Sequence, residues 1–401
     1  MRPVSLGVAL SIQLFSAQLG LLSANAYDIV KDYSGATFFD GFHFYGSYDN
    51  LTSGDVDYVT RENATAKRLA FVNGEGRAVM RVDNATDTIY LEKRESVRIE
   101  SRLWYGPGTL WIADIVHMPF GCSVWPALWT TGKNWPDDGE IDIIEGINLM
   151  ENNQVALHTT PGCMHIDPPP PNQRGVSRQL NCTIDAGCTV GETAPNSFGA
   201  GFNAAGGGVY ATQFDESGIY IWFWSRPNIP KSILEATSTS SITSLDDWGP
   251  ATASYPSGPH CEITKFFKAQ KIIINITLCG IWAGNPEFYT PQCGNQGVTG
   301  LCYNDNVVGF GTARKYDNAY FEFNYLRTYT NGQAQVFDPD VDSDTSPSSS
   351  SGTRSPPSST GSSGASSTNT PGTSAASGLQ SFAAKGLASV AGAVSLALSM
   401  L

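Results

Sequence analysis

The run of residues 139–146 carries three carboxylates, Glu140, Asp142 and Glu145, separated by isoleucines. Isoleucine favours a buried strand, and side chains of a strand alternate between its faces, so Glu140 and Asp142 point the same way. Glu145 lies an odd number of residues from Glu140 and would face the other way in a regular strand. One extra residue, a β-bulge among residues 142–144, returns it to the first face. Two carboxylates on one face, with a third between them to tune a proton, are what hydrolysis of a glycosidic bond needs.

Two other interpretations of this acidic run are weaker. A solvated acidic strand would carry serine or lysine between its acids, whereas this run carries isoleucine. A calcium loop would place Asp or Asn at alternate positions and a glycine at the turn, and isoleucines do not leave such a loop flexible. We therefore interpret the run as catalytic and expect neither a catalytic metal nor another cofactor; a structural calcium ion is left open.

The overall composition indicates the kind of substrate. The 401 residues carry a net charge of −13, with 24 basic and 37 acidic side chains. This balance disfavours a nucleic-acid partner and suits a neutral polysaccharide. The chain also has 9 Trp, 16 Tyr and 19 Phe. Aromatic rings are platforms for the apolar faces of sugars, but they also fill β cores, so only those near the acidic run are candidates.

The N-terminus indicates export. Arg2, an apolar stretch and the small residues Ala24 and Ala26 predict a signal peptide over residues 1–26, with a mature chain that begins at Tyr27. Five N-glycosylation sequons agree with a secretory route: Asn50, Asn63, Asn84, Asn181 and Asn275. The last of them falls in an expected buried strand and is the weakest candidate.

The cysteines also fit an exported protein. All 8 of them lie between positions 122 and 302, and an even number in such a chain predicts disulfides. The pairing is left open by the sequence; the close pairs Cys182/Cys188 and Cys293/Cys302 are the easiest bridges. No Cys-x-x-Cys pair is present, so we expect no zinc site.

The C-terminal part differs in composition from the rest. Residues 338–378 are rich in Ser, Thr, Pro and Gly and are expected to form a disordered stalk. Residues 379–401 end in an apolar tail that is short for a span of roughly 20 residues. Small residues before the tail predict a GPI-attachment signal, with Ser374, Ala375 and Ser377 as candidates. An ordinary tail-anchoring helix is the alternative. We thus expect an extracellular protein at the cell membrane, the cell wall or both.

Residues 27–337 are predicted to be all-β. Helical periodicity is hard to find, and Gly, Pro and Asn separate short alternating runs. Strands are predicted at 109–117, 140–147, 154–159, 208–214, 219–224, 271–278 and 320–329. So many strands without crossover helices favour a sandwich of two antiparallel sheets. Residues 161–203 read as a long irregular loop stapled by its cysteines.

With these features in view, the domain resembles glycoside hydrolase family 16, and more narrowly its fungal laminarinase-type endo-1,3(4)-β-glucanases. The resemblance covers nearly all of residues 27–337 and excludes the stalk and tail. It is carried by segments 96–101, 112–119, 124–129, 134–146, 157–163, 279–284 and 319–326. The Glu-x-Asp-x-x-Glu spacing matches the bulged form of the family's laminarinase branch.

The resemblance implies a β-jelly-roll sandwich with an open concave cleft. It implies that Glu140 is the nucleophile, Glu145 the acid/base and Asp142 the neighbour that assists them. Because two close carboxylates repel each other, one keeps its proton. We assign the raised pKa to Glu145 and expect Glu140 to stay ionised.

Five further side chains are candidates for contact with sugar. Trp135 is the best candidate for stacking on a glucose ring. For Trp129, a place in the cleft and a place in the core are equally supported. Trp282 resembles a cleft tryptophan of the family. His158 and Arg98 could hydrogen-bond sugar hydroxyls, or could be structural. Trp125, by contrast, is expected in the core.

The leading hypothesis is a retaining endo-β-glucanase for 1,3- or mixed 1,3-1,4-linked glucans, a monomer attached to the membrane by a lipid anchor. One alternative is a cell-wall transglycosylase, in which another sugar captures the same intermediate; the bulged motif disfavours it. A glucan-binding module without catalysis is the other, and the presence of both glutamates disfavours it.

Overall fold

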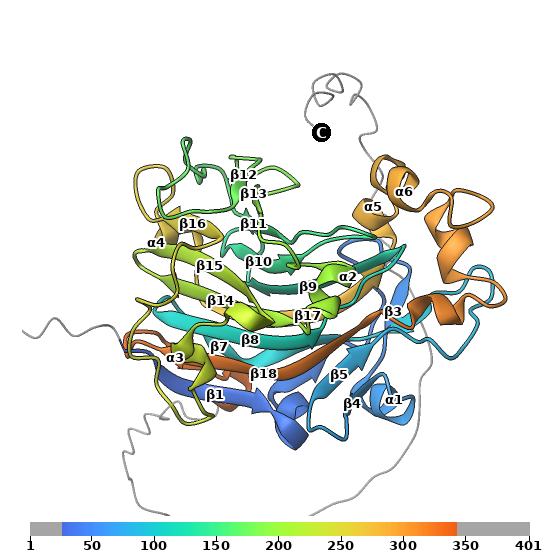
Figure 1. Cartoon of the computed structure of the whole chain (residues 1–401), viewed down its shortest axis with the longest axis horizontal. Coiled ribbons are helices and arrows are strands. Elements are labelled where there is room, and N and C mark those ends of the chain that lie inside the picture. Colours follow the sequence, from blue (N-terminus) through green and yellow to red (C-terminus); the bar gives the residue numbers. More distant parts are fainter. Residues whose placement is uncertain (1–25, 343–401) are drawn as a thin grey trace, which may run out of the picture. The chain divides into compact units, whose positions relative to one another are not determined.

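The computed structural model describes residues 26–342, and two large antiparallel sheets dominate this part of the chain (Figure 1). The eight-strand sheet runs in the order β16 (Ala253–Pro256), β15 (Gly218–Ser225), β14 (Gly208–Asp215), β8 (Thr109–His117), β18 (Tyr320–Thr330), β5 (Ala78–Arg81) and β4 (Ala70–Val72), with β1 (Asp28–Ser34) also paired to β18.

The nine-strand sheet runs in the order β12 (Val176–Ser177), β13 (Cys188–Gly191), β11 (Gln154–His158), β10 (Glu140–Glu145), β9 (Val124–Thr131), β17 (Gln270–Leu278), β7 (Arg98–Tyr105) and β19 (Val336–Phe337). In addition, β2 (Phe42–Phe44) pairs with β7. A small parallel pair joins β3 (Val56–Tyr58) to β6 (Arg94–Ser96).

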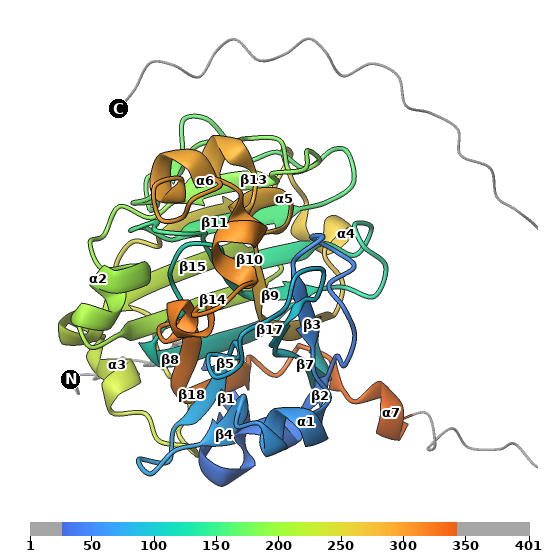
Figure 2. The same ribbon diagram turned by 90° about the vertical axis from the view of Figure 1, so that its right-hand side faces the viewer.

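The helices are short and lie around the sheets, not between them (Figures 1 and 2). They are α1 (Arg61–Ala66), α2 (Gly199–Ala204), α3 (Lys231–Leu234), α4 (Ile263–Phe266), α5 (Gly280–Ala283), α6 (Pro286–Cys293) and α7 (Pro339–Asp342). Short stretches of 3₁₀ or π-helix occur at Gly35–Gly41, Arg226–Asn228, Tyr303–Val307 and Ala313–Tyr316. Within residues 26–342, no helix is long and apolar enough to cross a membrane.

The facing sides of the two sheets form the main core. Trp111 and Tyr210 from the eight-strand sheet and Leu128, Ile143 and Ile272 from the nine-strand sheet line one small interior space. These alternating apolar side chains provide the burial that holds the sandwich together. The expected all-β sandwich of antiparallel sheets is therefore confirmed.

A second core packs on the outer side of the eight-strand sheet. Trp222 and Trp224 of β15 meet Trp248, and both of their indole nitrogens donate to backbone carbonyls of Trp248 and Gly249. The segment between β15 and β16 thus covers this face of the sheet. Both tryptophans of β15 are therefore used for packing, and the acidic run lies on the other sheet, in β10.

The predicted strands agree closely with the observed ones. All seven predicted segments are strands, and their boundaries differ by two residues at most. The stretch 161–203, expected to be irregular, also contains the short strands β12 and β13. The expectation that its cysteines staple this stretch is confirmed, since Cys163 bonds to Cys261 and Cys182 to Cys188.

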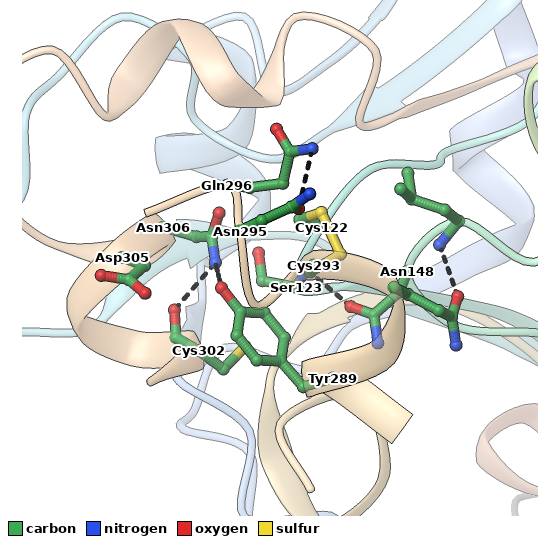
Figure 3. The surroundings of a disulfide bond; sticks show 12 residues. Cys122, Ser123, Asn148, Tyr289, Cys293, Asn295, Gln296, Cys302, Asp305 and Asn306 are labelled. Atoms are coloured by element: carbon green, nitrogen blue, oxygen red, sulfur yellow. Dashed lines mark hydrogen bonds between the residues drawn. A yellow bond between two sulfur atoms is a disulfide. The ribbon is translucent and has the colours of Figure 1, made fainter. Parts of the chain in front are cut away.

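The other predicted disulfide, Cys293–Cys302, is wrong. Cys293 of α6 bonds to Cys122 (Figure 3). Cys302 bonds to Cys279, which directly follows β17. The prediction rested on the short separation of the two cysteines along the sequence. In the fold, α6 turns Cys293 towards Cys122 in the loop before β9, and away from Cys302. The predicted disordered stalk begins too early, because residues 339–342 form the short helix α7. The rest of the stalk and the tail, with Ser374, Ala375 and Ser377, lie outside the described residues, as does the signal peptide up to residue 25.

Candidate active site

The acidic run forms β10, and a bulge in it is visible in the strand pairing. On one side Asp142 pairs with Trp129 and Ile144 with Leu128, so Ile143 is an extra residue. The pairing with β11 also shifts between Asp142 and Glu145. Ile143 and Ile144 are both buried in the core between the sheets. Two successive side chains therefore point inwards, and Glu145 returns to the face that carries Glu140 and Asp142, as predicted.

A glycine sets the start of this strand. Gly139 has φ +78°, which L side chains rarely adopt, and a Cβ there would lie 2.3 Å from the ring of Phe267. The chain thus turns tightly against Phe267 before entering β10. This turn fixes where Glu140 begins the strand.

His158 lies beside the acids from the neighbouring strand. It pairs with Glu140 across β10 and β11, and its Nε2 is 3.2 Å from Asp142 Oδ2 and 3.9 Å from Glu140 Oε1. Gly187 packs against the imidazole so closely that a Cβ would lie 2.9 Å from Nε2. His158 is therefore a member of the acidic cluster, held in place from behind.

Burial controls the protonation of all three acids. It raises the pKa of Glu145 to about 8, with a further increase from the charge of Asp142 and smaller decreases from His158 and Trp125. Burial likewise raises the pKa of Asp142 to about 8. The raised pKa expected for Glu145 is thus present, and this acid holds a proton at neutral pH.

Glu140 differs from our expectation of an ionised carboxylate. Burial, followed by the charge of Asp142, raises its pKa well above the usual range, although His158 and a hydrogen bond from Trp135 act in the opposite direction. The sequence places like charges side by side but does not reveal how completely they are removed from water. For Glu140 to be ionised, its neighbours must therefore hold the protons.

The buried acids should lower stability at high pH. Because the folded-state pKa of Glu140 lies above the usual 4.5, folding favours its protonated form, and this contribution is lost as pH rises from about 4.5 towards the folded pKa. We expect Glu140→Gln to raise the melting temperature by about 2–4 °C at pH 8 and to leave it unchanged at pH 4. Differential scanning calorimetry at both values tests this; an equal shift at both would contradict it.

Trp125 is a functional candidate that the sequence placed in the core. Its ring is buried, but its Nε1 donates a 3.0 Å hydrogen bond to Glu145 Oε1. Its edge packs against Trp282 of α5, with ring centroids 5.4 Å apart. Trp125 and Trp129 are four residues apart on β9 and so lie on the same face of the strand. Because Trp129 was already a candidate for the cleft, this spacing could have identified Trp125 as a functional candidate too.

Replacing Trp125 should shift the pH profile. The indole hydrogen bond favours the ionised form of Glu145, so Trp125→Phe should raise the pKa of Glu145 and move the alkaline limb of kcat/KM to higher pH. We expect kcat/KM to fall about tenfold, because the lost hydrogen bond stabilises the negative charge that Glu145 develops as it gives up its proton. Trp282→Phe, which replaces a neighbouring indole that has no bond to Glu145 by a smaller ring, is the control and should leave the limb in place. An unmoved limb in Trp125→Phe would refute this role.

The segment after Glu145 is anchored to α5 and to the loop before β9. The Asn148 side chain accepts from Ser123 N at 2.8 Å and donates to Ala283 O at 3.0 Å. Figure 3 shows the hydrogen bond between Ser123 and Asn148 beside the Cys122–Cys293 disulfide. The anchor therefore couples the end of the catalytic strand to the helix that carries Trp282.

The remaining predicted contact residues occupy different positions. Trp135 is 62% exposed and lies beside Glu140, and its stacking on a glucose ring stays a prediction. Trp129 donates from Nε1 to Asn275 Oδ1 at 2.7 Å, and Arg98 lies over both Trp129 and Tyr45. Arg98 is buried and paired with Glu100 at 2.7 Å. The ion pair that the sequence left open for Arg98 is therefore present.

The predicted glycosylation sites are unequal. Asn50 and Asn63 are exposed, and Asn84 and Asn181 are half-buried. Asn275 is only 8% exposed, and its side chain is bonded to Trp129 and Tyr58 inside β17. No glycan fits there without opening the sheet, so Asn275 is removed from the candidates.

The cluster also has the donor types of a cation site. Single ligand atoms of Glu140, Asp142 and His158 all lie within 4.8 Å of one another. The same closeness lets Glu140 and Asp142 share a proton, and proton sharing is the chemistry that the raised pKa values of these two acids indicate. The site thus combines a buried acid, a second carboxylate on the same face and a flanking exposed tryptophan.

Comparisons with known proteins agree with this geometry. Residues 42–329 match the model for the XgeA-like catalytic GH16 domain. A probable glycosidase of Schizosaccharomyces pombe is 36% identical over 76% of this chain and 70% of its own length. A probable endo-1,3(4)-beta-glucanase of Aspergillus niger is 36% identical over 78% of this chain, which spans only 41% of that relative.

Solved structures show the same fold. Laminarinase 16A from Phanerochaete chrysosporium, with 6-O-glucosyl-laminaritriose in its donor and acceptor sites, is 33% identical, with a TM-score of 0.69 over 76% of this chain and 100% of that one. An elongating family 16 beta-1,3-glucosyltransferase is 36% identical, with a TM-score of 0.67 over the same shares. The chain therefore belongs to glycoside hydrolase family 16, and its described part is the catalytic domain of that family.

Proposed function

We propose that this protein is a retaining endo-β-glucanase that hydrolyses 1,3-linked or mixed 1,3-1,4-linked glucans. The observation that carries the proposal is the bulge at Ile143, which places Glu145 on the same face as Glu140 and Asp142. A retaining mechanism needs two carboxyl groups close enough for one to attack C1 while the other protonates the leaving oxygen. The names of the relatives and the laminarinase neighbour support the choice of glucan.

In the first step, the ionised carboxylate of Glu140 attacks C1 of the sugar and forms an ester bond. The bond from C1 to the glycosidic oxygen breaks, and the proton of Glu145 moves to that oxygen. Its pKa of about 8 keeps Glu145 protonated at neutral pH, as a general acid requires. The departing chain leaves with a free hydroxyl.

In the second step, Glu145 acts as a base. The ester has neutralised Glu140, which removes one negative charge near Glu145 and makes its ionised form easier to hold. The carboxylate takes a proton from water, whose oxygen attacks C1 from the opposite side to Glu140. The ester bond breaks, Glu140 regains its charge, and the product has the original β configuration.

The direct test measures the release of reducing ends from purified laminarin, barley mixed-linked glucan and a 1,4-glucan. We expect activity on laminarin or on mixed-linked glucan, or on both, and little activity on the 1,4-glucan. Glu140→Ala should abolish this activity. Binding of laminarin without release by the wild type would instead support a non-catalytic glucan-binding protein.

Transfer to another sugar is the second candidate. The solved glucosyltransferase of the same family, at 36% identity, supports it. The glycosyl-enzyme is common to both reactions, and only the attacking hydroxyl differs. Incubation with laminari-oligosaccharides separates them: products longer than the substrate indicate transfer, and shorter products alone indicate hydrolysis.

We further propose secretion and attachment by a lipid anchor, on the basis of the signal peptide and the GPI-attachment signal. Tyr27, the expected first residue of the mature chain, is buried and bonded to Asp215. Release from membranes by a phosphatidylinositol-specific phospholipase tests the anchor. Single Asn→Gln variants test the sequons by electrophoresis. Some of the changes at Asn50, Asn63, Asn84 and Asn181 should increase the mobility because a glycan is lost, and the change at Asn275 should not.

A further inference from the structure

The pairing of the nine-strand sheet aligns a row of side chains that starts at Glu140. Its members pair successively across the strands: Glu140 with Thr131, Thr131 with Lys271, Lys271 with Trp104, and Trp104 with Phe337. Directly paired residues of antiparallel strands lie on the same face of a sheet. The row thus leads from the acidic cluster to the edge of the sheet.

We propose that Trp104, Lys271 and Phe337 form a remote sugar-binding subsite, an inference that rests on the proposed glucanase function. Trp104 lies three strands from β10, about 14 Å at the usual strand spacing. That distance exceeds one sugar ring, so this position contacts a unit well removed from the bond that breaks.

The side chains at this position have the chemistry to bind a sugar. Trp104 and Phe337 are half-buried, and their rings are nearly parallel, at an interplanar angle of 14°. Among residues 26–342, the Trp104 indole N–H has no hydrogen-bond partner, and it is not buried. It can therefore donate to a hydroxyl, while the exposed ring surface contacts the apolar face of the sugar.

Lys271 supplies further donors at a fixed place. Its ammonium group pairs with Glu100 and lies 5.8 Å from the centroid of the Trp104 ring. Glu100 also pairs with Arg98, which continues over Trp129 towards the acids. This ion-pair chain holds Lys271 and Trp104 in line with the catalytic row. The subsite is therefore preorganised, which reduces the entropy cost of binding a glucan.

The test compares laminari-oligosaccharides of increasing length with the wild type and Trp104→Ala. We expect kcat/KM on long chains to fall about tenfold, equivalent to one lost contact of moderate strength, with no change on the shortest chains that are cleaved. Phe310→Ala, a change at a fully exposed aromatic of another loop, is the control and should have no effect at any length. Equal losses at all lengths, or no loss on long chains, would overturn the proposal.

A second variant separates binding from packing of β19. Lys271→Met keeps the apolar part of the side chain and leaves Glu100 paired with Arg98. It should also lower kcat/KM on long oligosaccharides and leave kcat/KM on short ones unchanged. Binding can also be measured by calorimetry in Glu140→Ala. Adding Trp104→Ala to this variant should raise the Kd for a long oligosaccharide about tenfold. If the wild type cleaves no β-glucan, the proposed function fails; if it cleaves β-glucan and both variants keep its dependence on length, only the subsite fails.

Discussion

Glu140→Ala and Glu145→Ala should each reduce hydrolysis of laminarin by about 10³-fold or more, because each removes a group that bonds to or protonates the reacting atoms. Glu140 and Glu145 share one face of β10 only through the bulge, and neither has a nearby substitute in the same position. Glu151→Ala, a change at an exposed glutamate of the following loop, is the matched control and should be neutral. Initial rates of reducing-end release measure all three.

Added azide should distinguish the two glutamates. In Glu140→Ala, azide can enter the space that the nucleophile left and attack C1 from that side, which gives the α-glycosyl azide. In Glu145→Ala, an activated substrate still forms the ester with Glu140, and azide then attacks from the side of the missing base to give the β-glycosyl azide. The same anomer from both variants, or the reverse assignment, would contradict these roles.

Asp142→Asn should lower kcat about a hundredfold, because loss of a group that assists proton transfer is typically of this size. It should also shift the pH profile. The charge of Asp142 raises the pKa of Glu145, which is about 8. Its removal therefore lowers that pKa, and the alkaline limb of kcat/KM should move to lower pH, opposite to the shift expected for Trp125→Phe.

The measurement is kcat/KM as a function of pH, which reports the ionisations of the free enzyme. Asp137→Asn is the control, since Asp137 is exposed and lies in the turn before β10. A melting temperature close to that of the wild type at pH 4 would show that Asp142 is not needed for the fold. A limb that stays in place would assign Asp142 a purely structural role.

Much of this site could be predicted from the sequence because its signals are local. The alternation of Ile and acid gave the face of Glu140 and Asp142, and the odd spacing to Glu145 required a bulge, which the strand pairing confirms. The strands were equally predictable because their apolar alternation is strong. Such signals depend only on neighbouring residues.

The features that were missed depend on contacts between distant segments. Cys302 meets Cys279 because β17 ends beside it, and no spacing shows this. Trp125 looked like a core residue because burial and a bond to Glu145 are not exclusive. The raised pKa of Glu140 reflects how much water the surrounding strands exclude, a property of the assembled sheet. Long-range packing therefore set both the disulfides and the proton affinities.

The most direct test of the two-carboxylate account is to trap the covalent intermediate. A 2-fluoro glucan derivative with a good leaving group slows hydrolysis of the ester, and peptide mass spectrometry can then locate the attached sugar. We predict a single adduct on Glu140, which Glu140→Ala abolishes. An adduct on Glu145, or full turnover with no adduct, would contradict the account.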